Sequence, residues 1–361
     1  MPERRFTIPF ERRVSPDLDS ARTQHSRWVR QIGLLRTGQA RALHESWDVA
    51  RMVGGFLPDA RGERLDVCVD WNCAALVMDD QFDAGPLGWD APASVCALQG
   101  LAEAFYLPDA PCGAPGLHPL VRAFADVMRR LRALMSPAWC ARFAQHNLQG
   151  LAGFLDEVTD RTGPAQDMGW EDFLEVRRAS GYMFIEIDFI EVAQGYEVPA
   201  VLYGCKPMRT MRQCVLDLGV IHNDVYALGK ERGRGETLKF TEVLKQHHGC
   251  GEEQAIGHSQ RLNDEAVHTF LAAKEDLMAL LVRLELPEAD RKGTARFVSG
   301  MEHVISGVHD LHLESARYTD DGRFPLDGAG YVDDQHLAAA YHRGQRSRTT
   351  SGVGRARGHG L

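Results

Sequence analysis

Three carboxylates stand together where a long apolar run of the sequence ends. Residues 76–78 are apolar, and Asp79, Asp80 and Asp83 follow them directly. On a helix, Asp79 and Asp83 lie one turn apart on the same face. Carboxylates beside an apolar wall are costly unless a cation compensates them, and a hard cation such as Mg²⁺ prefers oxygen ligands. The stretch predicts a magnesium site, with a solvated helix end before the Gly85-Pro86 break as the alternative.

A second polar stretch, residues 223–231, also offers oxygen donors. Asn223 and Glu231 are eight residues apart on one helix face, and Ala227 lies midway between them. An amide oxygen and a carboxylate are both donors for hard cations. Facing the first stretch across a cavity, they would form the second wall of a metal cage. Asp224 is expected to orient neighbouring groups rather than to bind metal.

Long helices are needed to position these stretches, and the apolar pattern indicates helices throughout. Apolar residues recur at steps of three and four, without an alternating strand pattern, a hairpin signal or a repeat. The predicted helices cover residues 20–35, 38–53, 67–82, 92–106, 118–135, 137–158, 170–195, 207–231, 237–248, 251–256, 262–284 and 288–314, with a break at Ser180-Gly181. The chain is therefore predicted to be all-α, with roughly ten to twelve helices around one core.

The length allows one large domain or two of ordinary size. The chain has 361 residues, and hydrophobic residues make up 44% of it, enough for a sizeable core. We expect an extended lead-in over residues 1–20, a helical domain over 21–320 and a flexible tail over 321–361, where Gly, Asp, Arg and Ser accumulate.

Charge and cysteine usage narrow the class of protein. The net charge of −9 argues against a nucleic-acid binder. The eight cysteines form no Cys-x-x-Cys pair and show no zinc-type spacing. The sequence has no signal-like N-terminal stretch and no run long enough to span a membrane. We expect a soluble, cytoplasmic protein whose cysteines are reduced.

The two polar stretches together resemble the metal motifs of the class I terpene synthases, in particular the bacterial single-domain type. Residues 79–83 match the family's DDxxD motif, and residues 223–231 resemble its second motif, NDxxSxxKE. The resemblance covers roughly residues 5–320 and implies a helical bundle with a central active-site cavity. It also implies three Mg²⁺ ions that bind an isoprenyl diphosphate and trigger its ionisation, with ligands from Asp79, Asp80, Asp83, Asn223 and Glu231.

A further match lies at the predicted helix break. Arg177 is 46 residues before Asn223, about where the family has an arginine that senses the diphosphate. In the family, the residue three positions later links this arginine to a backbone carbonyl at the break. Ser180 and Gly181 fit these linker and effector positions.

Three further residues match positions of the family that contact the diphosphate, and two residues differ from the family's usual ones. Lys230 and the pair Arg317-Tyr318 stand where the family has residues that contact the diphosphate. The family usually has Ser or Thr where this chain has Ala227, and commonly Trp where it has Leu311. A methyl group cannot coordinate a cation, so water would have to fill that position or one ion would bind weakly.

A carbocation would need a dry apolar cavity and could be stabilised by aromatic faces. Trp71, Phe82, Phe184 and Tyr226 are candidates because they lie near the motifs in sequence, although ordinary core packing explains each of them as well.

The sequence therefore predicts a terpene cyclase that acts on a linear isoprenyl diphosphate. Farnesyl diphosphate is expected by analogy, with the geranyl and geranylgeranyl compounds as alternatives. Two other functions remain open: a chain-elongating prenyltransferase, and a non-catalytic binder that has lost a metal ligand at Ala227. Dimers are common in the family, so a homodimer is a further expectation.

Overall fold

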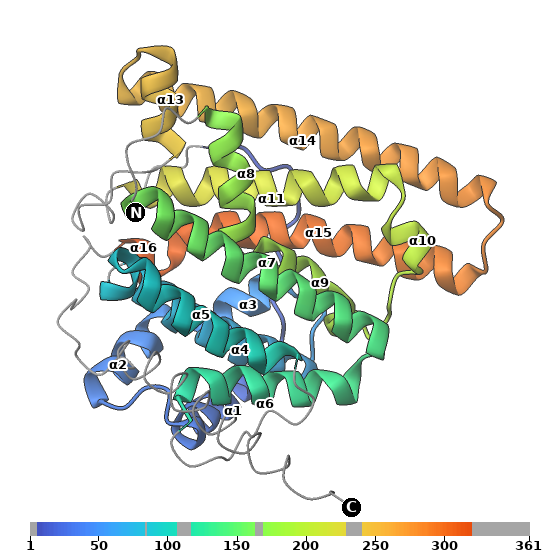
Figure 1. The fold of residues 1–361 in the computed structure, drawn as a ribbon. Coiled ribbons are helices and arrows are strands. Elements are labelled where there is room, and N and C mark those ends of the chain that lie inside the picture. The colour runs from blue at the N-terminus through green and yellow to red at the C-terminus, as the bar shows by residue number, and fades with distance from the viewer. Residues whose placement is uncertain (1–5, 84, 107–116, 163–168, 229–239, 320–361) are drawn as a thin grey trace, which may run out of the picture.

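The structure, a computed structural model, describes residues 6–83, 85–106, 117–162, 169–228 and 240–319 (Figure 1). Within these ranges every regular element is a helix, which confirms the predicted all-α fold. The elements are α1 (Leu18–Ile32), α2 (Gly38–Trp47), α3 (Val49–Phe56), α4 (Gly62–Asp83), the short 3₁₀ helix η1 (Pro86–Trp89), α5 (Ala91–Tyr106), α6 (Pro119–Leu134), α7 (Pro137–Thr162), α8 (Trp170–Ser180), α9 (Met183–Gln194), α10 (Ala200–Tyr203), α11 (Lys206–Tyr226), α13 (Phe240–His248), α14 (Glu252–Arg283), α15 (Glu288–Glu314) and α16 (Ala316–Thr319). The predicted tail, residues 321–361, lies outside the described residues.

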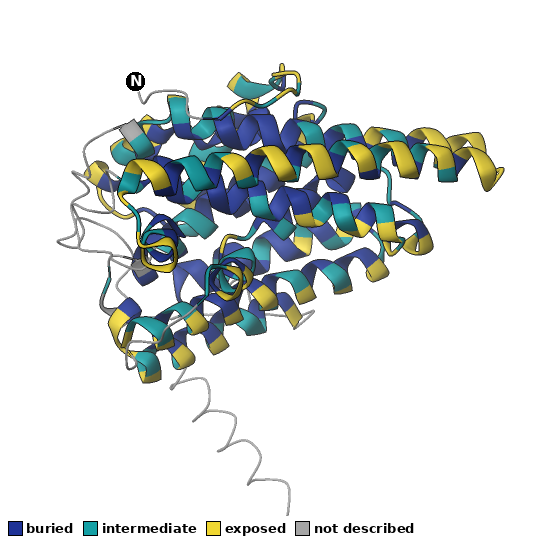
Figure 2. Ribbon diagram, turned by 90° about the horizontal axis from the view of Figure 1, so that it is seen from above, coloured by how far each residue is buried: buried dark blue, intermediate teal, exposed yellow. Residues whose placement is uncertain are grey.

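Helix α4 is surrounded by other helices and carries the first acidic stretch at its end. Residues 67–74 are buried without exception, and α1, α3, α6 and α9 pack around the helix. A helix that is apolar on every side needs such partners all round. Figure 2 shows this pattern for the whole bundle, with buried residues inside and exposed residues along the outer helix faces. The acidic residues therefore project from a rigidly packed element.

The helix predicted over residues 38–53 is in fact two helices joined at Asp48. Asp48 adopts a left-handed backbone with φ of 51°, which ends α2, and its side chain accepts a backbone N–H at the start of α3. The second of these helices runs on through Gly54 and Gly55 to Phe56, three residues beyond the predicted end at residue 53. Gly54 must be small because a Cβ there would lie 2.4 Å from the Leu18 side chain, and Gly307 of α15 must be small because a Cβ there would lie 2.7 Å from the backbone of Gly55.

The predicted helices 251–256 and 262–284 form one continuous helix, α14. Gly257 lowers helix propensity in the segment between them. Burial of Ala255, Ile256 and Ser259 outweighs this local weakness, and α14 packs along α11. The prediction was wrong here because packing between helices, which propensity does not report, decides the outcome.

Helix α11 carries the second polar stretch but ends earlier than predicted. It stops at Tyr226 instead of residue 231, and the buried residue Ala227 follows with its N–H bonded to the Asn223 carbonyl at 2.8 Å. Lys230 and Glu231 lie outside the described residues.

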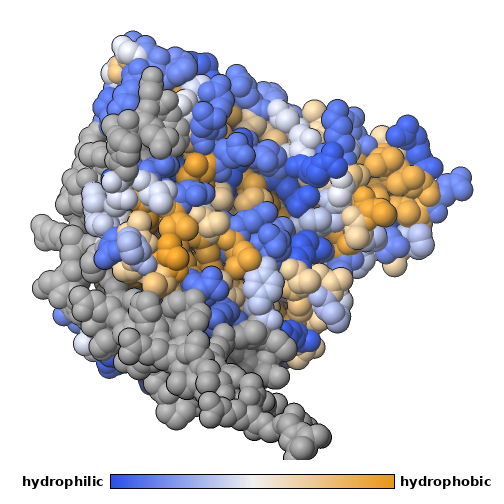
Figure 3. All heavy atoms as spheres, in the orientation of Figure 1, coloured by the Kyte–Doolittle hydropathy of each residue, from blue (hydrophilic) through white to orange (hydrophobic). Residues whose placement is uncertain are grey.

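The visible surface in Figure 3 is mixed, with apolar groups near the middle and towards the end of the molecule where α14 meets α15. Val201 and Val282 are among the exposed large apolar residues, at 82% and 69%. Scattered residues of this kind are normal on a protein surface. Among the described helices, none has the length and apolar character required to cross a bilayer.

Candidate active site

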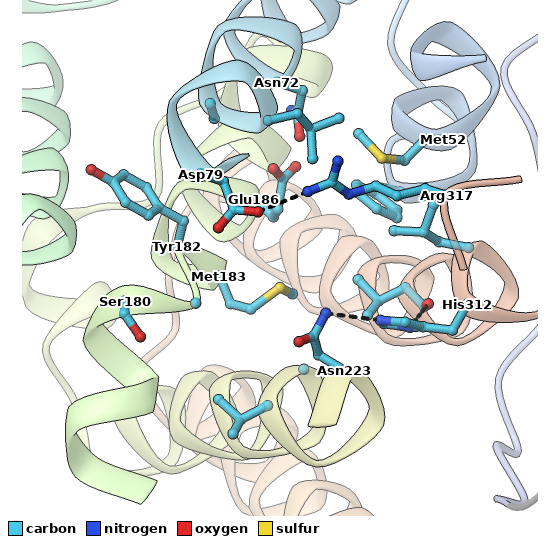
Figure 4. Close-up of a pocket in the computed structure, with 18 of the residues that line it drawn as sticks. Met52, Asn72, Asp79, Ser180, Tyr182, Met183, Glu186, Asn223, His312 and Arg317 are labelled. Atoms are coloured by element: carbon cyan, nitrogen blue, oxygen red, sulfur yellow. Dashed lines mark hydrogen bonds and ion pairs between the residues drawn. The ribbon is translucent and has the colours of Figure 1, made fainter. Parts of the chain in front are cut away.

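A cavity lies among α3, α4, α11 and α15, and the break between α8 and α9 forms part of its wall (Figure 4). Figure 4 shows Asp79 and Asn223 on different sides of it, so both predicted metal stretches reach the same space. The lining residues are Met52, Phe56, Trp71, Asn72, Ala75, Leu76, Asp79, Phe154, Arg177, Ser180, Gly181, Tyr182, Met183, Glu186, Gly219, Val220, Asn223, Val308, Leu311, His312, Arg317 and Tyr318.

The α4 wall consists of Asp79 and Asp80 together with Arg317 of α16. The Arg317 Nη2 donates to Asp79 Oδ2 at 2.8 Å and to Asp80 Oδ1 at 3.0 Å. The Arg317 Nη1 donates to Asp80 Oδ2 at 3.1 Å, which makes the contact with Asp80 two-pronged. The structure thus brings together two predicted metal ligands and a predicted diphosphate contact that are more than 230 residues apart in sequence.

Arg317 is held in a buried and strongly charged setting. Its side chain is only 2% exposed, and its Cζ lies 4.6 Å from the centre of the Trp47 ring. Burial alone would lower the pKa of Arg317, but the carboxylates of Asp80 and Asp79 raise it above its usual value. Its permanent positive charge therefore compensates the acidic residues.

The described oxygen donors fit a hard divalent cation. Asp79 and Asp80 offer carboxylates and Asn223 an amide, which suit Mg²⁺ better than a soft metal. Among the described side chains no group of three His, Cys, Asp or Glu residues could hold an ion alone. Two predicted ligands are not included in that search: Glu231 and the side chain of Asp83, which lies in the last turn of α4, are outside the described residues.

Hydrogen bonds fix the orientation of the Asn223 amide. Its Nδ2 donates to the Tyr318 hydroxyl at 3.2 Å and lies 3.2 Å from His312 Nε2. His312 Nδ1 lies 2.8 Å from the Val308 carbonyl, which can only accept, so Nδ1 carries the proton and Nε2 accepts from Asn223. Asn223 Oδ1, 3.4 Å from Arg177 Nη2, is left facing the cationic side of the site.

Arg177 belongs to a network on the other side of the cavity. Its Nη1 donates to Glu157 Oε1 at 2.5 Å and to Ser180 Oγ at 3.1 Å, and its Nη2 donates to Asp224 Oδ1 at 3.0 Å. The fully buried Asp224 also accepts the Phe240 N–H at 2.9 Å. Burial would lower the pKa of Arg177, but Asp224 and Glu157 raise it above its usual value. The arginine is thus anchored on two carboxylates.

The break between α8 and α9 lies at the predicted place, and the residue with a left-handed backbone is the one that follows Gly181. Gly181 has an ordinary φ of −70°, whereas Tyr182 is left-handed with φ of 55°. Gly181 is needed because a Cβ there would lie 2.9 Å from a carbonyl oxygen of the preceding turn. The Tyr182 ring covers Gly150 of α7, where a Cβ would lie 2.3 Å from the ring. The break therefore brings backbone to the cavity wall.

Only one of the four aromatic residues predicted to face a carbocation lines the cavity. Trp71 does, whereas Phe82, Phe184 and Tyr226 pack elsewhere in the core. A helix presents one face to the cavity, so closeness to a motif in sequence does not select the lining residues. The described aromatic residues of the lining are Phe56, Trp71, Phe154, Tyr182 and Tyr318.

The sequence reasoning did not identify Glu157, His312, Asn72 or Glu186. Glu157 and His312 reach the site from helices whose spacing to the motifs carries no periodic signal. The sequence does contain features that could have pointed to the other two residues. Asn72 precedes Asp79 by two helical turns, so both lie on one helix face, and Glu186 is an acidic residue within the largely apolar helix α9. Buried carboxylates are rare enough to deserve such notice.

Comparison with known proteins identifies the family. Residues 70–269 match the family model for terpene synthase family 2, C-terminal metal binding. Pentalenene synthase of Streptomyces avermitilis is 32% identical over 91% of this chain and 97% of its own length. The 7-epi-alpha-eudesmol synthase of Streptomyces viridochromogenes, named as cyclising (2E,6E)-farnesyl diphosphate, is 31% identical over 91% of this chain and 97% of its own.

A solved structure agrees with these sequence matches. The crystal structure of an a-eudesmol synthase is similar with a TM-score of 0.76 and 30% identity, over 86% of this chain and 99% of that one. The family model also covers more than half of the chain. The protein belongs to the bacterial class I terpene synthases, a family of metal-binding lyases.

Proposed function

We propose that this terpene synthase ionises farnesyl diphosphate with Mg²⁺, cyclises the carbocation to a terpene hydrocarbon or alcohol, and releases diphosphate. The observation that carries the proposal is the pair of largely buried arginines, Arg317 and Arg177, on two walls of one mainly apolar cavity. Farnesyl diphosphate is favoured because the S. viridochromogenes relative is named for that substrate.

Five residues would hold the cations. These are Asp79, Asp80, Asp83, Asn223 and Glu231, and the family resemblance implies three Mg²⁺ ions. Bound there, the ions would supply positive charge to the leaving diphosphate as its bond to carbon breaks. The orientation of the Asn223 amide, set by His312, supports this assignment because it turns Oδ1, now in a long contact with Arg177, towards the site and the Nδ2 group away from it.

Basic and hydroxyl groups of the chain would bind the diphosphate directly. Arg177 and Arg317 each present a planar fork that suits two phosphate oxygens. Tyr318 would add a hydroxyl donor, and Lys230 a further charge. Arg317 would have to turn from the carboxylates of the α4 wall to the diphosphate as the substrate binds.

Arg177 would also transmit substrate binding to the helix break. It contacts Ser180, which directly precedes Gly181 at the cavity wall. A small shift of the guanidinium towards the diphosphate would move Ser180 and turn the backbone at Gly181. Its carbonyl dipole would then face positive charge on the reacting hydrocarbon.

The rest of the lining would shape and protect the cation. Trp71, Phe154 and Tyr182 offer aromatic faces for cation–π attraction. The apolar walls exclude water, which would otherwise quench the carbocation early. The cavity outline would determine which carbons meet, and thus the product.

The test is incubation of the full-length protein with Mg²⁺ and one prenyl diphosphate at a time. Geranyl, farnesyl and geranylgeranyl diphosphate are compared without isopentenyl diphosphate, and products are identified by gas chromatography with mass spectrometry. We expect a cyclic fifteen-carbon product and released diphosphate from the farnesyl substrate. Products formed only when isopentenyl diphosphate is added would instead indicate a prenyltransferase. Tight Mg²⁺-dependent binding without any product would indicate a non-catalytic binder.

A further inference from the structure

Glu186 is a buried carboxyl group in the wall of the cavity that no step described so far uses. It is 5% exposed, lines the cavity, and lies between the fully buried Ile185 and Ile187. Its side chain is drawn in Figure 4, and its oxygen Oε2 has no hydrogen-bond partner among the described residues. Buried polar atoms are normally satisfied, so an exception facing a cavity points to a role towards the cavity's contents.

The two other buried acidic residues of α9 have hydrogen-bond partners, as buried polar groups normally do. Asp188 is bound by Arg142 at 3.3 Å, His146 at 2.6 Å and Tyr203 at 3.3 Å. Glu191 accepts bonds from the side chains of Trp139 and Arg142 and from the Val198 N–H. Neither of them lines the cavity. Glu186 alone among the three faces the cavity, and it alone retains an unpartnered oxygen.

Glu186 is hydrogen-bonded to Asn72, which lies two turns before Asp79 on α4, so Glu186 is separated from the carboxylates of the α4 wall. The Asn72 side chain hydrogen-bonds Glu186 and also donates to the Cys68 carbonyl at 3.1 Å. Asn72 precedes Asp79 by seven residues, which is about 10 Å along the helix axis. Glu186 is therefore near the part of the cavity suited to hydrocarbon rather than to diphosphate.

Glu186 is positioned to carry a proton. Burial raises the pKa of Glu186 to about 8, although the hydrogen bond with Asn72 lowers it. A group with this pKa is mostly a neutral carboxylic acid at pH 7. It can act as a general acid, because a buried carboxyl with a raised pKa keeps its proton until a base of sufficient strength is presented.

We propose that Glu186 is a catalytic proton donor, which protonates a carbon–carbon double bond of a neutral, partly cyclised olefin held in the cavity. The proposal rests on the proposed terpene cyclisation. In this step the O–H bond of Glu186 breaks, and the π pair of the olefin forms a new C–H bond. The olefin becomes a carbocation again, and the Glu186 carboxylate remains beside it as a counter-charge.

The protons balance over the cycle. The first cation forms the neutral olefin by losing a proton, which leaves with the released diphosphate. Glu186 then supplies one proton for the second cation. When this cation forms the final olefin, its proton returns to Glu186, and the carboxylic acid exchanges with solvent after product release. No oxidant, reductant or further cofactor is required.

The test uses the full-length protein with farnesyl diphosphate and Mg²⁺ in D₂O. We expect the wild-type product to contain one carbon-bound deuterium. Glu186→Gln keeps the size and hydrogen bonding of the acid but cannot donate its proton. This variant should release diphosphate within about threefold of the wild-type rate while the wild-type product falls at least tenfold. In its place a less cyclised olefin without deuterium should accumulate.

Glu191→Gln is the matched control, since it makes the same change on the same helix away from the cavity. It should give the wild-type product with its deuterium, and thermal melting checks that both variants are folded. Turnover that yields no carbon-bound deuterium would overturn the inference and leave the proposed function intact. The same holds if Glu186→Gln makes the deuterated wild-type product. Absence of turnover with every prenyl diphosphate would overturn both proposals.

Discussion

The α4 wall and the second wall, formed by α8 and α11, each place one arginine between two carboxylates, but these carboxylates differ in their proposed duties. On the α4 wall, Arg317 contacts Asp79 and Asp80, which are also proposed metal ligands. A cation bound there competes with the guanidinium for the same oxygens. Arg317 must therefore release them when the site is loaded.

On the second wall the anchors and the proposed metal ligand are separate residues. Arg177 contacts Glu157 and Asp224, and neither belongs to the proposed ligand set. The described ligand on this wall is Asn223, whose neutral Oδ1 lies 3.4 Å from Arg177 Nη2, and the other proposed ligand of this stretch, Glu231, lies outside the described residues. Loading the site therefore leaves both carboxylate partners of Arg177 in place.

Two arginines that each pair with two carboxylates can therefore differ in mobility, because only one of them shares its partners with the metal. We expect Arg317 to move by a large rotation and Arg177 to shift only slightly, enough to affect Ser180. The comparison can be tested, because bound Mg²⁺ can directly replace the positive charge lost beside Asp79 and Asp80, whereas Glu157 and Asp224 are not proposed metal ligands. Removing one partner of a buried ion pair typically costs about 3–5 kcal/mol.

Arg177→Ala should have the largest effect. It removes the link to the helix break and leaves the buried Asp224 and the partly buried Glu157 without a cation. We expect turnover of farnesyl diphosphate to fall on the order of 10³-fold, as when a group that stabilises developing charge is lost. The free energy of unfolding, measured by urea titration, should fall by about 3–5 kcal/mol, and Mg²⁺ should not restore it.

Arg178→Ala is the matched control for this variant. Arg178 is the next residue of α8 and pairs with Asp217 of α11 at 2.5 Å, but it does not line the cavity. A partly exposed pair of this kind contributes about 0–1 kcal/mol, so stability and turnover should change little. Near-normal turnover of Arg177→Ala would refute its assignment as the diphosphate sensor.

Arg317→Ala should have the second largest effect, and its stability should depend on Mg²⁺. Turnover should fall on the order of 10²-fold because one diphosphate contact is lost. Without metal, Asp79 and Asp80 repel each other, and the melting temperature should drop. Saturating Mg²⁺ should recover a substantial part of this drop, in contrast to Arg177→Ala.

Arg51→Ala is the control at this end of the molecule, since Arg51 pairs with Glu314 at 3.2 Å and both side chains are well exposed. It should melt like the wild type with and without Mg²⁺. If Mg²⁺ protected the Arg177 and Arg317 variants equally, the proposed difference between the walls would be wrong.

Asp224→Asn should have a smaller effect that again does not respond to Mg²⁺. The amide keeps one oxygen, but its NH₂ group must face either Arg177 or the Phe240 N–H, which are both donors. A lost hydrogen bond to a charged group costs about 1.5–3 kcal/mol. We expect a loss of stability in this range by urea titration and roughly tenfold lower turnover, while Asp217→Asn should change both only slightly. Recovery of Asp224→Asn by Mg²⁺ would count against a purely anchoring role.

The fold and the outline of the site could be predicted because they depend on local patterns. Helical periodicity indicates the helices, and the family resemblance implies that Arg177 and Asn223 serve one site, where the structure places Arg177 Nη2 3.4 Å from Asn223 Oδ1. The break after Ser180 was also visible as a glycine within a helical pattern. Such signals are local in sequence or shared by a family, so one chain is enough to recognise them.

The remaining features depend on which helices meet, and local patterns do not report this. Glu157 reaches Arg177 only because α7 packs against α8, where a Cβ on Gly153 would lie 2.5 Å from the Ser180 nitrogen. His312 orients Asn223 only because α15 packs against α11. The continuity of α14 is likewise decided by packing. Contacts between distant helices therefore determine how the recognised residues are held.

Ala227→Ser should have the smallest effect and tests the composition of the second wall itself. Ala227 keeps a helical hydrogen bond to the Asn223 carbonyl, so a serine hydroxyl there would lie on the same helix face as the Asn223 amide. If the wall lacks a protein ligand, the added oxygen should lower the Mg²⁺ concentration for half-maximal turnover about three- to tenfold, which corresponds to about 0.7–1.4 kcal/mol. Ala227→Cys is the control of similar size, because a soft sulfur is a poor Mg²⁺ ligand. An unchanged Mg²⁺ requirement in the serine variant would mean that water already completes the coordination, and that the α4 wall carries most of the metal affinity.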